Sequence, residues 1–134
     1  MSHISNDSNI NYCYNICTQY YRPPEILLEC KTYTNKIDLW SIGCVIVEMI
    51  TFDVLFNYDN NESHINGIFE LFGTPTRDTK QFNFSHSYKN KFPKYSQNKD
   101  FIQTSDSKLK KILDNLLVIN PADRASATSA LQIV

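Results

Sequence analysis

Two stretches decide the fold of this chain. The first is Tyr20-Tyr21-Arg22-Pro23-Pro24-Glu25-Ile26-Leu27-Leu28, and the second is DLWSIGCVIVEMIT, which begins at Asp38. The prolines of the first stretch delay a helix until Pro24, where proline in a first turn is favourable, so a short helix is expected over residues 25–29. The second stretch is apolar almost all the way round a helix, which is typical of a helix in the middle of a domain.

Three further helices are expected downstream. Apolar residues recur at helical spacing over residues 65–72 and 109–117, and a last short helix is expected over residues 127–133. Gly73 and Pro75 form a stop after the first of these helices, and residues 105–107 offer N-caps for the second. Together with the two opening stretches, this predicts a mainly α chain of about four to five helices around a buried central helix.

Two segments show no regular period. Residues 1–17 are rich in Asn and Ser and are expected to form an irregular leader, while residues 76–104 are expected to form a long ordered loop. Gly43 lies inside the helix that begins at Asp38. A glycine inside a helix costs about 1 kcal/mol relative to alanine, which suggests that another backbone packs closely there.

Composition limits the function classes. The 134 residues are 42% hydrophobic and 13% aromatic, enough for the core of one domain. Thirteen basic and fourteen acidic residues give a net charge of -1, so neither nucleic acid nor an anionic membrane is expected as a partner. The densest basic group is expected to be a solvated helix face rather than a polyanion site; it comprises Lys108, Lys110 and Lys111.

The cysteines and histidines predict no metal site. Cysteines stand at positions 13, 17, 30 and 44 and histidines at 3, 64 and 86, with no CxxC pair and no zinc spacing. A reducing, intracellular compartment, cytoplasm or nucleus, is therefore expected. The longest nearly uncharged run, residues 39–50, is shorter than the roughly 20 residues that span a bilayer.

Four motifs, read in order, resemble the CMGC group of Ser/Thr protein kinases, which includes the cyclin-dependent, MAP, SR-protein and dual-specificity kinases. They are TQYYRPPEILL (residues 18–28), KIDLWSIGCVIVEMIT (36–51), INGIFELFGTP (65–75) and LLVINPADRASATSAL (116–131). The resemblance covers roughly residues 15–131. It implies a partial kinase C-lobe over residues 18–134 with no N-lobe sheet, preceded by an activation-segment-like leader over residues 1–17.

The resemblance implies a long-range ion pair. Pro24 and Glu25 match the end of the family's Ala-Pro-Glu motif, with Pro23 in place of the small residue, and Arg124 matches its arginine partner. A buried, bidentate pair of Glu25 and Arg124 is expected on this basis. The plainer alternative is a surface arginine and a helix-terminal glutamate that never meet.

The resemblance also assigns substrate-loop roles to residues just before the Pro-Glu motif. Arg22 matches an arginine that braces the activation segment, and Thr18 matches a threonine beside the catalytic aspartate; the alternative for Thr18 is a loop hydroxyl without a role. Gln19 replaces an arginine common in MAP, SR-protein and dual-specificity kinases. The usual phosphorylated positions align with Cys13 and Asn15, so no phosphorylation switch is evident.

Asp38 and Trp40 belong to the motif of the central helix. Asp38 matches the aspartate that anchors the backbone of the catalytic loop, and it is also a candidate N-cap of this helix. Both interpretations can hold together.

The stretch 74–104 lies where CMGC kinases carry an insertion that is often a docking surface. Its aromatic side chains could anchor a protein partner, or they could pack onto the domain to hold a long loop. These are Phe82, Phe84, Tyr88, Phe92 and Tyr95.

The 134 residues contain no catalytic motif of a kinase. A kinase needs a Gly-rich loop, a strand lysine, a catalytic-loop Asp and Asn, and a DFG-type Asp for magnesium. The chain has only three glycines, at positions 43, 67 and 73, and no HRD-like or DFG-like triplet. No catalytic, cofactor-binding or metal residue is therefore expected, and ATP and Mg²⁺ are expected only if an N-terminal half completes the domain.

Three functions follow from this pattern. The first is a truncated or split Ser/Thr kinase domain that is inactive alone. The second is a kinase-derived module that binds a protein partner through the apolar faces of the central helix or through the insert 74–104. The third is a C-terminal half that completes a kinase in trans.

Overall fold

The computed structural model describes residues 18–75, 92–98 and 100–134. In this part of the chain there are five α-helices, one 3-10 helix and no strand, so the expected mainly α fold is confirmed there. The elements are η1 (Gln19–Tyr21), α1 (Pro24–Leu27), α2 (Lys36–Thr51), α3 (Asn61–Phe72), α4 (Ser107–Leu116) and α5 (Ala127–Leu131). The leader predicted over residues 1–17 lies outside the described residues.

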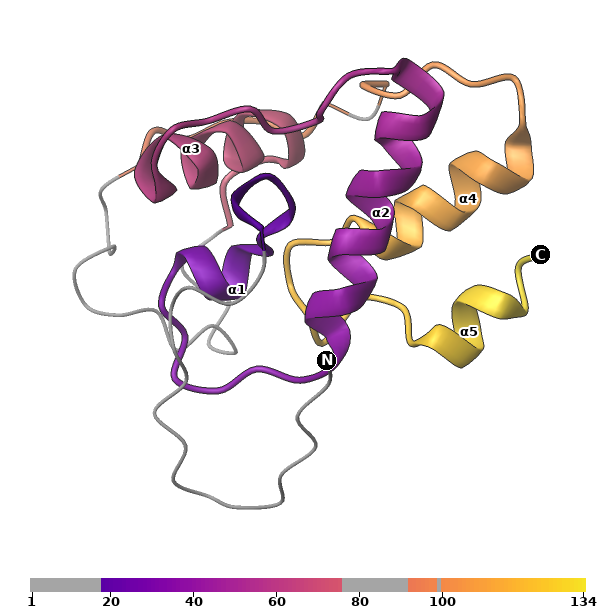
Figure 1. Ribbon diagram of the computed structural model, residues 1–134, viewed down its shortest axis with the longest axis horizontal. Helices are drawn as coiled ribbons and strands as arrows, with labels where there is room; N and C mark the ends of the chain where they lie inside the picture. The colour runs from indigo at the N-terminus through magenta and orange to yellow at the C-terminus, as the bar shows by residue number, and fades with distance from the viewer. Residues whose placement is uncertain (1–17, 76–91, 99) are drawn as a thin grey trace.

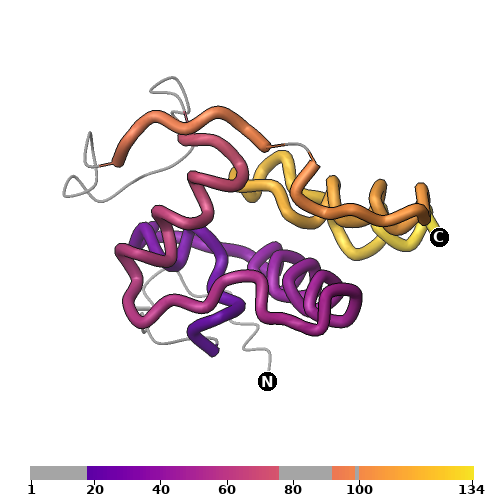
Figure 2. Tube along the Cα trace, turned by 90° about the horizontal axis from the view of Figure 1, so that it is seen from above, coloured from indigo at the N-terminus to yellow at the C-terminus, as the bar shows by residue number. Residues whose placement is uncertain are grey.

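The central helix is α2, the longest of the five. In Figure 1, α1 and α3 lie to the left of α2, whereas α4 and α5 lie to its right. Figure 2, seen from above, shows α4 and α5 together on one side of α2. Contacts between elements follow this arrangement, because α2 touches η1 and α4, α1 touches α3, and α4 touches α5.

Helix α2 begins two residues earlier than expected. Its N-cap position is Asn35, whose side chain makes no capping bond, and Asp38 lies in the first turn. The side chain of Asp38 is exposed and accepts no hydrogen bond from a described residue, so the N-cap interpretation of Asp38 is wrong. Its carboxylate still lies near the positive end of the helix dipole.

Gly43 lies where α2 packs closely against the end of α4. A Cβ atom at this position would lie 2.7 Å from Leu117 Cδ2 and 3.3 Å from Leu116 Cβ. The expected close packing is therefore present, but the neighbours are leucine side chains at the end of α4 and not another backbone.

Helix α3 begins four residues earlier than expected, at Asn61, whereas its end at Gly73 and the N-cap of α4 within residues 105–107 lie where the sequence predicts them. The side chain of Asn60 accepts from Ser63 N at the start of α3, and Gly73, with φ +86°, ends it. The side chain of Asp106 accepts from Lys108 N and Leu109 N at the start of α4. These local bonds fix the ends of both helices.

Aromatic side chains connect the helices in the core. Trp40 of α2 is fully buried, stacks on Phe56 with 6.2 Å between ring centroids, and meets Phe72 at 5.6 Å. Phe72 in turn meets Phe101 edge-on at 4.9 Å. Offset and edge-on pairs of this kind stabilise a core beyond the area they bury.

Two of the five aromatic residues of the insert pack onto the domain. Phe92 meets Phe69 edge-on at 5.2 Å, and Tyr95 is half-buried against the core. Thr74 N donates to Tyr95 O, and Thr74 Oγ1 accepts from Tyr95 N, so the two ends of the insert are tied together. For these two residues the packing interpretation is confirmed, while Phe82, Phe84 and Tyr88 lie outside the described residues.

The core also holds a histidine that has no hydrogen-bond partner among the described residues. His64 of α3 is fully buried, stacks on Tyr58 at 6.0 Å and meets Phe56 at 5.3 Å, and neither ring nitrogen is bonded. Burial, aided by the charge of Arg22, lowers the pKa of His64 from 6.5 to about 4.

We predict that acid destabilises the fold through His64. Because its folded pKa lies below the unfolded value, its neutral form is preferred in the fold, and stability falls as pH drops from 6.5 towards 4. The loss between about pH 7.5 and pH 5 should be roughly 2 kcal/mol, measured by urea denaturation. His64→Phe keeps the aromatic contacts and should flatten this part of the pH profile, and an unchanged profile in this variant would contradict the assignment.

Candidate functional site

The side chain of Arg124 is the most highly connected polar group in the described part of the chain. Its Nη1 and Nη2 donate to Glu25 Oε1 and Oε2 at 2.7 and 3.0 Å. Nη1 also donates to Lys36 O at 2.7 Å, Nη2 to Ile119 O at 3.3 Å, and Nε to Val118 O at 3.0 Å. All five N–H donors of a guanidinium are thus used.

Glu25 and Arg124 therefore form the buried, bidentate pair that the family resemblance implied, 99 residues apart in sequence. Pro24 and Glu25 occupy the first turn of α1, so the carboxylate also lies near the positive end of that helix. Both side chains of the pair are almost completely buried. The alternative of two surface groups that never meet is excluded.

Two α2 residues complete the surroundings of Arg124. Its Cζ lies 5.3 Å from the ring centroid of Trp40, within the range of a cation–π contact. The Lys36 ammonium donates to the backbone carbonyl of Arg124. In return, the Arg124 guanidinium donates to the backbone carbonyl of Lys36. The pair thus joins α1, the start of α2 and the loop after α4.

The segment before α1 is held against α2. Tyr21 Oη donates to Glu48 Oε2 at 2.6 Å, and Ser41 Oγ donates to Tyr21 O at 2.9 Å. The bond to Glu48 raises the pKa of Tyr21 above its ordinary value of 10, because it stabilises the protonated phenol. The sequence reasoning missed these two partners, although Glu48 is the only charged residue in the run 39–50 and was therefore the available signal.

The same segment is also held against the loop before α3. Gln19 Nε2 donates to Tyr58 O at 2.8 Å, and Arg22 Nη1 donates to Asn61 Oδ1 at 2.9 Å. Both side chains reach a segment 39 residues away in sequence. The structure thus gives Gln19 and Arg22 the same task, which is to fix residues 19–22 against the start of α3.

Thr18 and Asp38 remain outside this network. Thr18 is exposed, and no described residue bonds its hydroxyl; its carbonyl accepts from Tyr21 N. Asp38 is exposed as well. The roles that the resemblance gives these two residues remain predictions.

The described residues offer no nucleophilic thiol and no metal cluster. Burial raises the pKa of Cys30 to about 11 and that of Cys44 to about 12, so both thiols stay protonated at neutral pH. No group of three or more metal-binding side chains occurs in residues 18–75, 92–98 and 100–134. Nor does any of the described helices combine the length and hydropathy needed to cross a bilayer.

We predict that the Glu25–Arg124 pair is required for stability. Glu25→Ala should lower the free energy of unfolding by about 3–5 kcal/mol, because it leaves a buried guanidinium without its counter-charge. Arg124→Lys should also destabilise, since an ammonium cannot donate five bonds in one plane.

Glu70→Ala is the matched control, because Glu70 is exposed and bonds to no described residue; its effect should stay within about 0.5 kcal/mol. Urea denaturation of all three variants tests the prediction. A loss of less than 1 kcal/mol in Glu25→Ala would contradict it.

Comparison with known proteins bears directly on this arrangement. A family model described as protein kinase domain matches residues 2–134 of the chain. The probable serine/threonine-protein kinase glkA of Dictyostelium discoideum is 35% identical in an alignment that covers 91% of this chain and 26% of that protein. The serine/threonine-protein kinase ppk23 of Schizosaccharomyces pombe is 38% identical over 87% of this chain and 31% of that protein.

A cyclin-dependent kinase is among the relatives. Cyclin-dependent kinase 11 of Dictyostelium discoideum is 35% identical over 87% of this chain and 34% of that protein. The chain thus spans about a third or less of the length of these relatives. Because the family model covers almost all of it, the chain belongs to the protein kinase family, as part of a kinase domain whose relatives are Ser/Thr kinases, cyclin-dependent ones among them.

Proposed function

We propose that this chain is the substrate-side part of a Ser/Thr kinase domain and that the 134 residues do not transfer phosphate by themselves. The observation that carries the proposal is the anchoring of residues 19–25. Side chains fix this segment to α2 and α3, and the Glu25–Arg124 pair fixes it to the loop after α4. A segment held from three sides is suited to position a peptide substrate.

The same residues carry the proposed roles within the segment. Arg22, bonded to Asn61, braces the loop that receives the substrate. Gln19, bonded to Tyr58 O, fixes the first part of the same loop. Thr18 is proposed to face the catalytic aspartate, with its exposed hydroxyl available for that contact.

The phosphate-side chemistry is proposed to come from the preceding half of a kinase domain, on whichever polypeptide carries it. The 134 residues hold no Gly-rich loop and no HRD-like or DFG-like triplet, so they offer no ligands for ATP or Mg²⁺. The proposed location is intracellular, where Cys30 and Cys44 would remain reduced.

The outer face of α2 supports the need for a partner. Three apolar side chains at helical spacing are exposed on one side of the helix, Ile42 (48%), Val45 (42%) and Met49 (71%), and the C-cap residue Phe52 (93%) is exposed at its end. Contiguous exposed apolar side chains of this kind mark interaction surfaces. We propose that the preceding kinase half covers this face.

A first experiment is a kinase assay of the purified chain with ATP, Mg²⁺ and a generic basic substrate. We expect no phosphoryl transfer above a blank without protein, because the ligands for nucleotide and metal are absent from these residues. Turnover at a rate typical of protein kinases, about 1–100 s⁻¹, would refute the proposal.

A second experiment tests the outer face of α2 by copurification with the N-terminal half of the ppk23 kinase domain. The unmodified chain should copurify, and Met49→Glu should not, because a carboxylate would be buried in an apolar contact. Leu131→Glu is the matched control, since Leu131 is 74% exposed on α5, away from this face, and should behave like the unmodified chain. Equal recovery of all three chains would count against the α2 face.

The alternative function is a kinase-derived interaction module that binds a protein without completing a kinase. It is favoured by the closed core and the satisfied Glu25–Arg124 pair, which suit a chain that folds alone. Under this alternative the isolated chain shows a cooperative melting transition and recovers no activity with any N-terminal kinase half. A chain that melts without cooperativity would exclude the module.

A further inference from the structure

The exposed side chains on the outer face of α2 follow one narrow seam. Ile42, Val45 and Met49 recur at intervals of three and four residues, and the C-cap residue Phe52 continues the series. Apolar residues at this spacing form a stripe narrow enough to be covered by a single further segment of chain. Asp38 begins the same row, and its exposed carboxylate accepts no hydrogen bond from a described residue.

The chain enters the described fold beside this seam. Element η1 touches α2, where Tyr21 Oη donates to Glu48 and Ser41 Oγ donates to Tyr21 O. Val45 lies four residues after Ser41 and three before Glu48, so on the helix it is a neighbour of both. The residues directly before Thr18 therefore start next to the outer face of α2.

The end of the leader is long enough to cover the seam. From Ile42 to Phe52, helix α2 rises about 15 Å, at 1.5 Å for each residue. Seven extended residues, such as 10–16, span about 23 Å. The leader thus reaches along the whole seam without any change in the fold after Thr18.

The same seven residues carry side chains that suit an apolar seam. The leader as a whole has no period, but in residues 10–16 every second side chain is large and apolar or aromatic, and none is charged: Ile10, Tyr12, Tyr14 and Ile16. An extended chain places every second side chain on one face. Asn11 and Asn15 would then face the solvent.

The two tyrosines also fit the polar end of the seam. A tyrosine packs its ring on apolar surface while its hydroxyl keeps a polar partner. The carboxylate of Asp38, at the start of the row, can accept such a hydroxyl bond. Isoleucine, tyrosine and asparagine are weak helix formers, which favours an extended rather than a helical cover.

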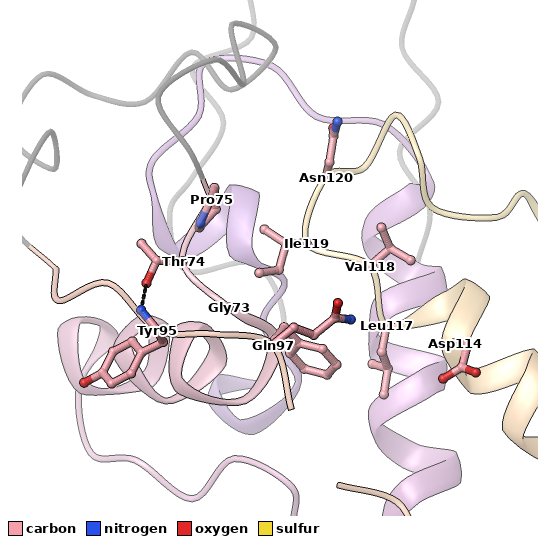
Figure 3. Close-up of a pocket in the computed structure, with 11 residues that line it drawn as sticks. Gly73, Thr74, Pro75, Tyr95, Gln97, Asp114, Leu117, Val118, Ile119 and Asn120 are labelled. Atoms are coloured by element: carbon pink, nitrogen blue, oxygen red, sulfur yellow. Dashed lines mark hydrogen bonds between the residues drawn. The ribbon is translucent and has the colours of Figure 1, made fainter. Parts of the chain in front are cut away.

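A second hollow of the described surface is less well placed for the leader. It is a cavity of about 400 Å³ between the ends of α3 and α4 (Figure 3). Its lining includes no residue of η1, α1 or α2. Of these two surfaces, the outer face of α2 is the one that lies beside the entry of the chain.

We propose that residues 10–16 lie extended along the outer face of α2 in the free chain, and that they leave it when the preceding kinase half binds. A cover tethered to the same chain acts at a high effective concentration, so it shields the exposed apolar side chains without a partner. It also competes with the preceding half for the same face. The exchange rests on the proposed function, whereas the cover of the free chain does not.

The test of the cover uses the methyl group of Met49 as a probe. The 134 residues contain only two methionines, Met1 and Met49, so ¹³C-methyl labelling gives a signal at the seam. A neutral gadolinium chelate in solution broadens exposed methyl signals. In the double variant Tyr12→Asp/Tyr14→Asp the broadening of the Met49 signal should rise at least threefold, because carboxylates are not buried against an apolar seam.

Asn11→Asp/Asn15→Asp is the matched control, since it adds the same charge on the side chains that face solvent. Broadening of the Met49 signal in this control should stay within about 1.5-fold of the unmodified chain. Equal broadening in the unmodified chain and the tyrosine variant would overturn the proposal. A Met49 signal that shifts when the unmodified chain is diluted would overturn it as well, because the occupant would then be a second copy.

The exchange is tested by calorimetric titration with the N-terminal half of the ppk23 kinase domain. The tyrosine variant should bind at least threefold more tightly than the unmodified chain, because no cover has to be displaced. The asparagine variant should bind like the unmodified chain, and equal binding of all three chains would overturn the exchange. No binding by any of them refutes the proposed function and the exchange together, whereas the cover is decided by the Met49 signal alone.

Discussion

The described fold depends on the guanidinium of Arg124, because its five donors join segments that are far apart in sequence. They bond the carboxylate of Glu25 in α1, the carbonyl of Lys36 at the start of α2, and the carbonyls of Val118 and Ile119 after α4. In a buried setting an unpaired charge is costly, so these bonds form or fail together. The start of α1 is therefore fixed to the loop after α4 by this one side chain.

Helix α2 presents two apolar faces with different neighbours. Gly43 lets the helix approach Leu117 closely, whereas Met49 and the C-cap residue Phe52 are exposed. Phe52 is unfavourable on two counts, since it is 93% exposed and its backbone has φ +60°, a left-handed conformation that a bulky residue rarely adopts. The left-handed backbone of Phe52 ends the helix, and its exposed side chain belongs to the face for which a partner is proposed.

Sequence reasoning succeeded where the determinants are local. The stop at Gly73 and a cap within residues 105–107 follow from backbone chemistry of a few neighbouring residues. The Glu25–Arg124 pair came from family resemblance alone, because no spacing rule joins residues 99 apart. The start of α2 was misplaced for a related reason. The N-cap residue Asn35 makes no side-chain cap, and the first helical residue, Lys36, is bonded instead to Thr34 Oγ1 through its N–H and to Arg124 through its carbonyl and its ammonium. The bonds of Gln19 and Arg22 could not be predicted either, since one partner is the backbone carbonyl of Tyr58 and the other the side-chain amide of Asn61, the first residue of α3.

The Arg124 network and the cavity share one segment, which has a physical consequence. The side chains of Val118 and Ile119 line the cavity, while their carbonyls hold Arg124. The bonds to Arg124 therefore help to fix one wall of the cavity between the ends of α3 and α4, because the buried guanidinium is costly to leave without these carbonyls.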